Sequence, residues 1–169
     1  MIADLAELRG ERSRWRTDGR RLVLTNGCFD LLHVGHVRSL AAARSFGDVL
    51  VVGINGDASV RALKGPGRPL VPASERAEIV ASLAVVDQVV VFEEATAVAL
   101  VEALCPDLYV KGGDYGPRAV SGRPLPEEEA VRRCGGAVRF TAFEPGHSTS
   151  ELASRLGRVG RADAAGTPE

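Results

Sequence analysis

Cysteine, lysine and long apolar runs are all scarce in this chain of 169 residues. Its three cysteines, Cys28, Cys105 and Cys134, are odd in number and form no CxxC pair, so the sequence indicates neither a disulfide framework nor a structural zinc module. No apolar run approaches the roughly 20 residues that a membrane-spanning helix needs, and the start of the chain lacks the apolar segment of a signal peptide. We therefore expect a soluble protein in a reducing cytoplasm, without membrane association.

Excess charge of either sign is also absent. The chain has 21 Lys and Arg residues against 22 Asp and Glu residues, for a formal net charge of -1. This balance predicts no nucleic-acid partner, because binding to a phosphate backbone needs a broad basic surface. Any phosphate site must therefore be local. Only two of the basic residues are lysines, and both Lys64 and Lys111 precede a glycine. Arginine-favouring codon usage explains the ratio but not this placement.

Short β-branched runs alternate with longer amphipathic stretches, a pattern typical of βα units around a parallel sheet. The sequence predicts an α/β fold, namely one doubly wound Rossmann-like domain with a five-stranded parallel sheet. The expected organisation is an N-terminal helical extension (1–19), the domain itself (20–158) and a disordered tail (159–169). The predicted strands are 21–25, 48–53, 88–92, 107–110 and 137–141, and the predicted helices are 2–16, 34–46, 58–63, 73–83, 96–104, 127–133 and 150–158.

Ligands of such sheets bind beyond the carboxyl ends of the strands, which draws attention to the loop after the first strand. Two histidines, His33 and His36, stand three residues apart at an expected helix start, so both rings should lie on one face. Gly35 between them would let a phosphate approach the backbone, where free N–H groups and the helix dipole favour an anion. Two alternatives stay open: one capping and one packed histidine, or a zinc site with Cys28 that lacks a fourth ligand.

Neither GxxxxGK[ST] nor GxGxxG follows a predicted strand, which disfavours P-loop kinases and dinucleotide-dependent dehydrogenases. What remains is a phosphate site made of imidazoles, a helix N-terminus and isolated lysines. Such a site suits nucleotidyl transfer, because the attacking group is already a phosphate anion and needs no general base. The protein then has only to align two anions and neutralise the leaving pyrophosphate.

The stretch GCFDLLHVGHVRSL resembles the HxGH-motif nucleotidylyltransferases of the cytidylyltransferase-like superfamily. The resemblance continues through LKGPGRP, an ERxxxL-like helix, VKGGDY and GHSTS, and covers about residues 20–157. Within the superfamily the chain is most similar to the D-glycero-D-manno-heptose 1-phosphate adenylyltransferases, whose activity is often one half of a bifunctional protein with a sugar kinase. The resemblance implies ATP and a phosphorylated sugar as substrates, and enzymes of this kind are often homodimers. Triphosphate chemistry and the shortage of clustered carboxylates predict Mg²⁺ held mainly by the substrate phosphates.

The resemblance also implies three groups of site residues. His33, His36 and Lys64 would be catalytic, with Lys64 opening a Gly- and Pro-rich lid over the triphosphate. Asp30 would lie near the acceptor, and Arg76 would orient that lid or the acceptor phosphate. The nucleotide would be bound by residues of three loops: Asn26, Gly27, Cys28, Phe29, Gly35, Lys111, Gly112, Gly113, Asp114, Ser148, Thr149 and Ser150.

Plainer structural explanations exist for most of these residues. Lys64 could be a solvated loop residue, Arg76 could pair with Glu75 or Glu78 on a helix surface, and the Gly112-Gly113 pair could make a tight turn. The hydroxyl residues 148–150 could only cap a helix. Cys105, Cys134, Trp15 and Tyr109 are expected to serve packing. Two other functions stay open, cytidylyl transfer to glycerol 3-phosphate or another phospho-alcohol, and a nucleotide-binding module without catalysis.

Overall fold

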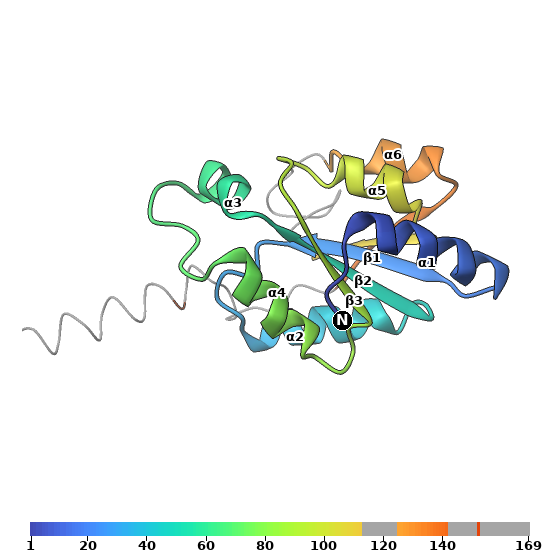
Figure 1. Ribbon diagram of the computed structural model, residues 1–169, viewed down its shortest axis with the longest axis horizontal. Coiled ribbons are helices and arrows are strands. Elements are labelled where there is room, and N and C mark those ends of the chain that lie inside the picture. The colour runs from blue at the N-terminus through green and yellow to red at the C-terminus, as the bar shows by residue number, and fades with distance from the viewer. Residues whose placement is uncertain (113–124, 142–151, 153–169) are drawn as a thin grey trace, which may run out of the picture.

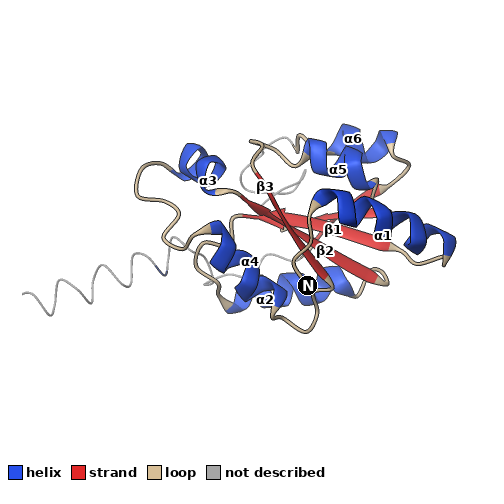
Figure 2. Ribbon diagram, in the orientation of Figure 1, coloured by secondary structure: helices blue, strands red, loops and turns tan. Residues whose placement is uncertain are grey.

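Five parallel strands form one sheet in the computed structural model, which describes residues 1–112 and 125–141, together with Leu152 (Figure 2). The strand order is β3-β2-β1-β4-β5, and every neighbouring pair is parallel. This confirms the predicted α/β class and the doubly wound sheet. The elements are α1 Leu5–Thr17, β1 Leu22–Gly27, α2 Val34–Arg44, β2 Val49–Asn55, α3 Asp57–Lys64, α4 Ala73–Ala81, β3 Gln88–Phe92, α5 Val98–Leu104, β4 Leu108–Lys111, α6 Glu128–Arg133 and β5 Ala137–Phe140.

Helices cover both faces of the sheet (Figure 1). Successive residues of a strand point to opposite faces, so Leu22 and Leu24 of β1 pack into one core cluster and Val23 into the other. Helices α1, α5 and α6 cover the first face, and Leu8 and Trp15 of α1 are buried there. Helices α2 and α4 cover the second face. A ligand at the edge of the sheet is therefore flanked by two different helical layers.

The two central strands extend beyond their apolar runs. β1 and β2 were predicted to end at residues 25 and 53, but backbone pairing continues through Asn26 opposite Gly53 and Gly27 opposite Ile54. Asn55 at the end of β2 pairs with Phe92 of β3. The apolar pattern could not reveal this extension, because a backbone ladder does not depend on apolar side chains. As a result, the polar side chains of Asn26 and Asn55 are held at fixed positions on the carboxyl edge of the sheet.

The N-terminal helix begins three residues later than predicted, at Leu5. Its capping box explains the start, because the Asp4 carboxylate accepts a hydrogen bond from the Glu7 backbone N–H and Glu7 reciprocates. Ile2, which was expected inside this helix, instead forms a parallel bridge with Val89 and is half exposed. The division at residues 19 and 158 stays a prediction, and both the expected helix 150–158 and the tail 159–169 fall outside the described residues, apart from Leu152.

The interpretation of Cys105 and Cys134 as mere packing residues is wrong, because the two form a disulfide with a Cα–Cα distance of 5.0 Å. Each cysteine is the residue at which a helix ends, Cys105 after α5 and Cys134 after α6. Their separation of 29 residues carried no recognisable spacing signal, and an odd count leaves room for one pair beside a free Cys28. Disulfides are typical of oxidising compartments, so the cytoplasmic location stays a prediction. No helix of the described residues is long and apolar enough to cross a membrane.

Candidate active site

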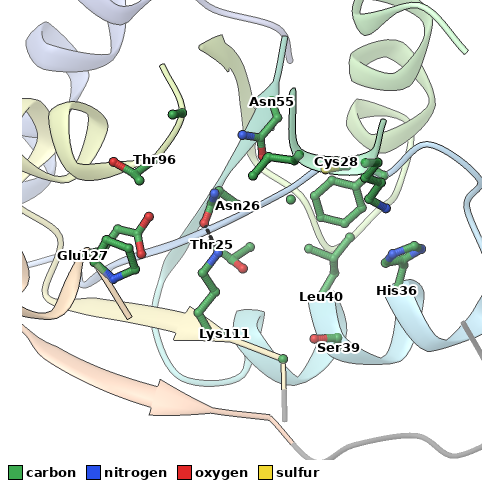
Figure 3. A pocket seen from close by; sticks show the side chains of 17 residues that line it. Thr25, Asn26, Cys28, His36, Ser39, Leu40, Asn55, Thr96, Lys111 and Glu127 are labelled. Atoms are coloured by element: carbon green, nitrogen blue, oxygen red, sulfur yellow. Dashed lines mark hydrogen bonds between the residues drawn. The ribbon is translucent and has the colours of Figure 1, made fainter. Parts of the chain in front are cut away.

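A cavity of about 630 Å³ opens at the carboxyl ends of β1, β2 and β4 (Figure 3). This is the edge at which open α/β sheets bind ligands. One wall comes from α2 and the end of α3, and the opposite wall comes from the loop before α5 and the start of α6. The lining residues are Thr25, Asn26, Gly27, Cys28, Phe29, His36, Ser39, Leu40, Asn55, Leu63, Lys64, Ala95, Thr96, Lys111, Gly112, Pro126 and Glu127.

Eight of the site residues predicted from the sequence line this cavity: Asn26, Gly27, Cys28, Phe29, His36, Lys64, Lys111 and Gly112. Four others, His33, Gly35, Asp30 and Arg76, lie near it but are not among its lining residues. The remaining five candidates, Gly113, Asp114, Ser148, Thr149 and Ser150, lie outside the described residues.

The two histidines lie on one face of the start of α2, as their spacing predicted. His33 is the N-cap residue, and its ring stacks on that of His36 with the centroids 3.8 Å apart. The Phe29 ring packs against the other side of His36 at 5.1 Å. The backbone N–H of His33 donates to Nδ1 of His36 over 3.4 Å. This bond requires Nδ1 to be an acceptor, so a neutral His36 ring carries its proton on Nε2 and can donate from there.

Electrostatics reinforce the neutral form of His36. Burial, together with the nearby charges of His33 and Lys64, lowers the pKa of His36 from its usual 6.5 to about 4. A bound phosphate would oppose the two charge effects and raise this pKa again. An anion bound beside His36 would therefore favour the protonated ring more than the free protein does.

We expect the stability of the free protein to fall with decreasing pH between about 6.5 and 4. In this range His36 binds a proton in the unfolded state but stays neutral in the folded state. The loss is complete below the folded pKa and is at most about 3 kcal/mol. The measurement is the free energy of unfolding in urea at pH 7.0, 6.0, 5.0 and 4.5, for the wild type and for His36→Asn. Equal pH slopes for the two proteins would contradict the shifted pKa.

Asn26 is held in one orientation by two donors. Its Oδ1 accepts hydrogen bonds from the Lys111 Nζ at 2.6 Å and from the Tyr109 hydroxyl at 2.5 Å. An ammonium can only donate, so the atom beside it must be the amide oxygen, and Nδ2 points away from Lys111. Figure 3 shows this nitrogen on the side of Asn55. Tyr109, which was expected to serve packing alone, thus helps to present an N–H donor to the cavity.

Asp30 does not line the cavity, and its expected place near the acceptor stays a prediction. Its buried carboxylate pairs with Arg68 and accepts the backbone N–H groups of Leu70 at 2.6 Å and Val71 at 3.2 Å. Burial by itself raises the pKa of Asp30, but these hydrogen bonds and the Arg68 charge outweigh it and hold the pKa below its usual value. Both oxygens are occupied, so Asp30 fastens the loop between α3 and α4.

Arg76 fastens the same loop from the other side. It is 1% exposed and not on a helix surface, so the proposed pairing with Glu75 or Glu78 is wrong. Its Nε donates to the Val71 carbonyl at 2.8 Å, one terminal nitrogen donates to the Cys28 carbonyl, and the other pairs with Asp57 at 2.7 Å. One guanidinium therefore ties the loop after β1, the start of α3 and the loop before α4 together, which matches the alternative of a loop-orienting role.

Lys64 is the last residue of α3 rather than the first residue of a lid. The following loop is anchored from Arg68 to Val71 by Asp30 and Arg76, which leaves only the segment 65–67 without such ties. Gly65 and Gly67 adopt φ angles of +91° and +85°, a region that glycine occupies without strain. The lid role of this loop stays a prediction, with 65–67 as the segment that none of these contacts holds. The side chain of Lys64 is itself exposed.

The zinc interpretation of Cys28 with the two histidines is also wrong. The described residues contain no group of three or more His, Cys, Asp or Glu side chains that could hold a metal ion. Burial raises the pKa of the Cys28 thiol, although the charges of Lys64, Arg76 and Lys111 lower it, so a thiolate ligand is disfavoured. The expected Mg²⁺, held mainly by substrate phosphates, stays a prediction.

Several lining residues carried no signal in the sequence. Thr96 and Glu127 lie just before α5 and α6, where polar residues are ordinary, and Glu127 is the first of three consecutive glutamates. Ser39 is an ordinary helix residue of α2, and Asn55 ends an apolar strand. Only the tertiary structure brings these side chains to one cavity.

Comparison with known proteins supports this picture. A family model described as cytidylyltransferase-like matches residues 24–154. The bifunctional protein HldE of Geotalea uraniireducens is 53% identical over 141 residues, which are 83% of this chain and 28% of that protein. The bifunctional protein HldE of Geobacter sulfurreducens is 49% identical over 155 residues, or 92% of this chain and 31% of that protein. The chain thus spans about a third or less of the length of these curated relatives.

Solved structures share the fold. The lipopolysaccharide core biosynthesis protein of Thermoplasma volcanium superposes with a TM-score of 0.60 at 25% identity, covering 75% of this chain and 98% of the other. Pantoate-beta-alanine ligase of Francisella tularensis superposes with a TM-score of 0.56 at 14% identity, covering 95% of this chain and 79% of the other, and supports the fold alone. With the paired histidines at the start of α2, the matched family model and relatives near 50% identity, the chain belongs to the cytidylyltransferase-like family.

Proposed function

We propose that this chain is a nucleotidylyltransferase that transfers AMP from ATP to a sugar 1-phosphate and releases pyrophosphate. The observation that carries the proposal is the stacked pair of His33 and His36 at the start of α2, beside a cavity that Lys64 also lines. A helix N-terminus, a neutral imidazole donor and a mobile ammonium are the groups that a triphosphate needs. A nucleotide-binding module without catalysis would not require this combination.

In the proposed reaction, an oxygen of the acceptor phosphate attacks the α-phosphorus of ATP as the bond to pyrophosphate breaks. The attacking group is already an anion, so no side chain has to remove a proton. His36 donates from Nε2 to a phosphate oxygen, and the Lys64 ammonium neutralises charge that moves onto the leaving pyrophosphate. Mg²⁺, when bound through the phosphates, would supply further charge neutralisation. The protein's main contributions are therefore alignment and electrostatic stabilisation.

D-glycero-D-manno-heptose 1-phosphate is the proposed acceptor. The segments VKGGDY and LKGPGRP resemble the heptose enzymes, and relatives called HldE support the same choice. A pyrophosphate-release screen tests it, with ATP, CTP and GTP each offered together with a heptose 1-phosphate or glycerol 3-phosphate. We expect ATP with the heptose phosphate to be the best pair. Robust cytidylyl transfer to glycerol 3-phosphate without ATP-dependent activity would contradict the proposal. The homodimer and the cytoplasmic location stay predictions.

Lys64→Arg is expected to reduce kcat by roughly 10-fold or more, about 1.4 kcal/mol of transition-state stabilisation, while much of the ATP affinity is retained. An ammonium can follow a phosphate with any of its three donors, whereas the larger guanidinium fork needs a fixed orientation. Steady-state kinetics with saturating substrates measure the effect. Arg61→Lys, an exposed exchange on the same helix and outside the cavity lining, is the control. A wild-type turnover number for Lys64→Arg would contradict this role and support the interpretation of Lys64 as a solvated surface residue.

A further inference from the structure

The two walls of the cavity differ in charge. His36 and Lys64 stand on the wall formed by α2 and α3, where they offer hydrogen-bond donors. Glu127 stands on the opposite wall, at the start of α6, and is the one acidic residue among the described residues that line the cavity. Figure 3 shows Glu127 beside Thr96 and across from His36, with Asn26 between the two walls. A ligand that fills the cavity therefore faces hydrogen-bond donors at one end and a carboxylate at the other.

Glu127 is held rigidly and is not a surface residue. It is 4% exposed, and its Oε1 accepts a hydrogen bond of 2.9 Å from the buried backbone N–H of Ala97, which precedes α5. Its Oε2 receives no hydrogen bond from the residues that the structure describes. In Figure 3 the carboxyl group extends from the α6 side toward the middle of the cavity. The backbone thus fixes one oxygen and leaves the other to a ligand.

A carboxylate oxygen can only accept hydrogen bonds, and it repels a phosphate. Hydroxyl groups are the matching donors, and bonds from neutral donors to an ionised acceptor are among the stronger ones. Thr96 adds a hydroxyl beside Glu127, and the oriented Nδ2 of Asn26 adds a donor for a hydroxyl oxygen. We infer that Glu127 is a specificity-determining residue that binds sugar hydroxyl groups and so directs the phosphates of the ligand to the opposite wall.

This inference rests on the proposed function, because it assumes a ligand that carries both phosphate and sugar hydroxyls. Two sources of those hydroxyls share the same chemistry, the ribose of the nucleotide and the sugar of the acceptor. Inorganic tripolyphosphate has phosphates and no sugar hydroxyls, so it tests the opposite wall alone. Binding measured by calorimetry requires no turnover and is therefore independent of the reaction.

The test is Glu127→Gln, which keeps an oxygen for the Ala97 N–H and replaces the second acceptor with a donor. We expect the Kd of the hydroxyl-bearing ligand to rise about 10- to 100-fold, while the Kd of tripolyphosphate stays within about twofold of the wild-type value. Glu128→Gln, an exposed exchange one residue later, is the matched control and should change neither value. ATP, 2′-deoxy-ATP, 3′-deoxy-ATP and heptose 1-phosphate are compared. A loss confined to ATP identifies the ribose, and a loss confined to the sugar phosphate identifies the acceptor.

Unchanged affinity for both ATP and heptose 1-phosphate in Glu127→Gln would overturn the inference. An equal loss for tripolyphosphate would overturn it as well, because the effect would then be structural. If circular dichroism shows that Glu127→Gln is unfolded, Glu127→Asp takes its place and should show the same selective loss, since its shorter side chain cannot satisfy both partners. Failure of the proposed function has a different signature, a wild-type protein that binds neither ATP nor heptose 1-phosphate.

Discussion

His36→Ala is expected to lower kcat for nucleotidyl transfer about 100- to 1,000-fold and to change the Kd of ATP by less than about threefold. The Nε2 donor of His36 acts in a partly buried site, where a hydrogen bond to a developing charge is worth more than in water. Charge on the transferred group and the leaving pyrophosphate grows only as the bond breaks. An interaction that strengthens at that moment raises kcat rather than ground-state affinity.

Single-turnover kinetics and calorimetry with ATP measure the two quantities separately. Val37→Ala, at a position next to His36 that is 36% exposed, is the control and should leave both unchanged. His33→Ala should resemble His36→Ala, and the double variant should lose less than the sum because the stacked rings act on one phosphate cluster. A His36→Ala enzyme that loses only ATP affinity, at an unchanged kcat, would refute the catalytic assignment.

Arg76→Ala is expected to lower the free energy of unfolding by about 3 kcal/mol or more. Its guanidinium donates to two backbone carbonyls and to Asp57, and all three partners lose a donor when the side chain is truncated. Leaving such groups unsatisfied costs more than the bonds themselves contribute. Because Cys28 and Val71 belong to loops at the site, catalysis should fall together with stability.

Urea unfolding monitored by circular dichroism checks this value. Arg132→Ala removes an arginine whose ion pair with Glu128 is exposed on both sides, and it should cost less than about 0.5 kcal/mol. Arg76→Lys should recover only part of the loss, since one ammonium cannot reach three partners in three directions. An Arg76→Ala protein as stable as Arg132→Ala would show that the loops are held by other contacts.

Sequence patterns located most of the fold because its elements are locally coded. Apolar β-branched runs marked the cores of all five strands, and the spacing of His33 and His36 correctly placed both rings on one helix face. The errors, in contrast, have non-local causes. Strand ends at Asn26 and Asn55 depend on backbone pairing with a neighbour, and the Cys105–Cys134 disulfide depends on two helices that end side by side.

By itself the sequence determined the class of the fold, the family resemblance and the loop that carries the paired histidines, because each of these depends on residues close together in the chain. Only the tertiary structure decided that Asp30 and Arg76 hold loops instead of lining the cavity, that Lys64 ends a helix, and that Glu127 faces the histidine wall. The partners in these contacts can lie far apart in the sequence, as Asp30 and Leu70 do at a separation of 40 residues. These residues come into contact because of the order in which the strands pair. No local pattern in a single sequence reveals that order.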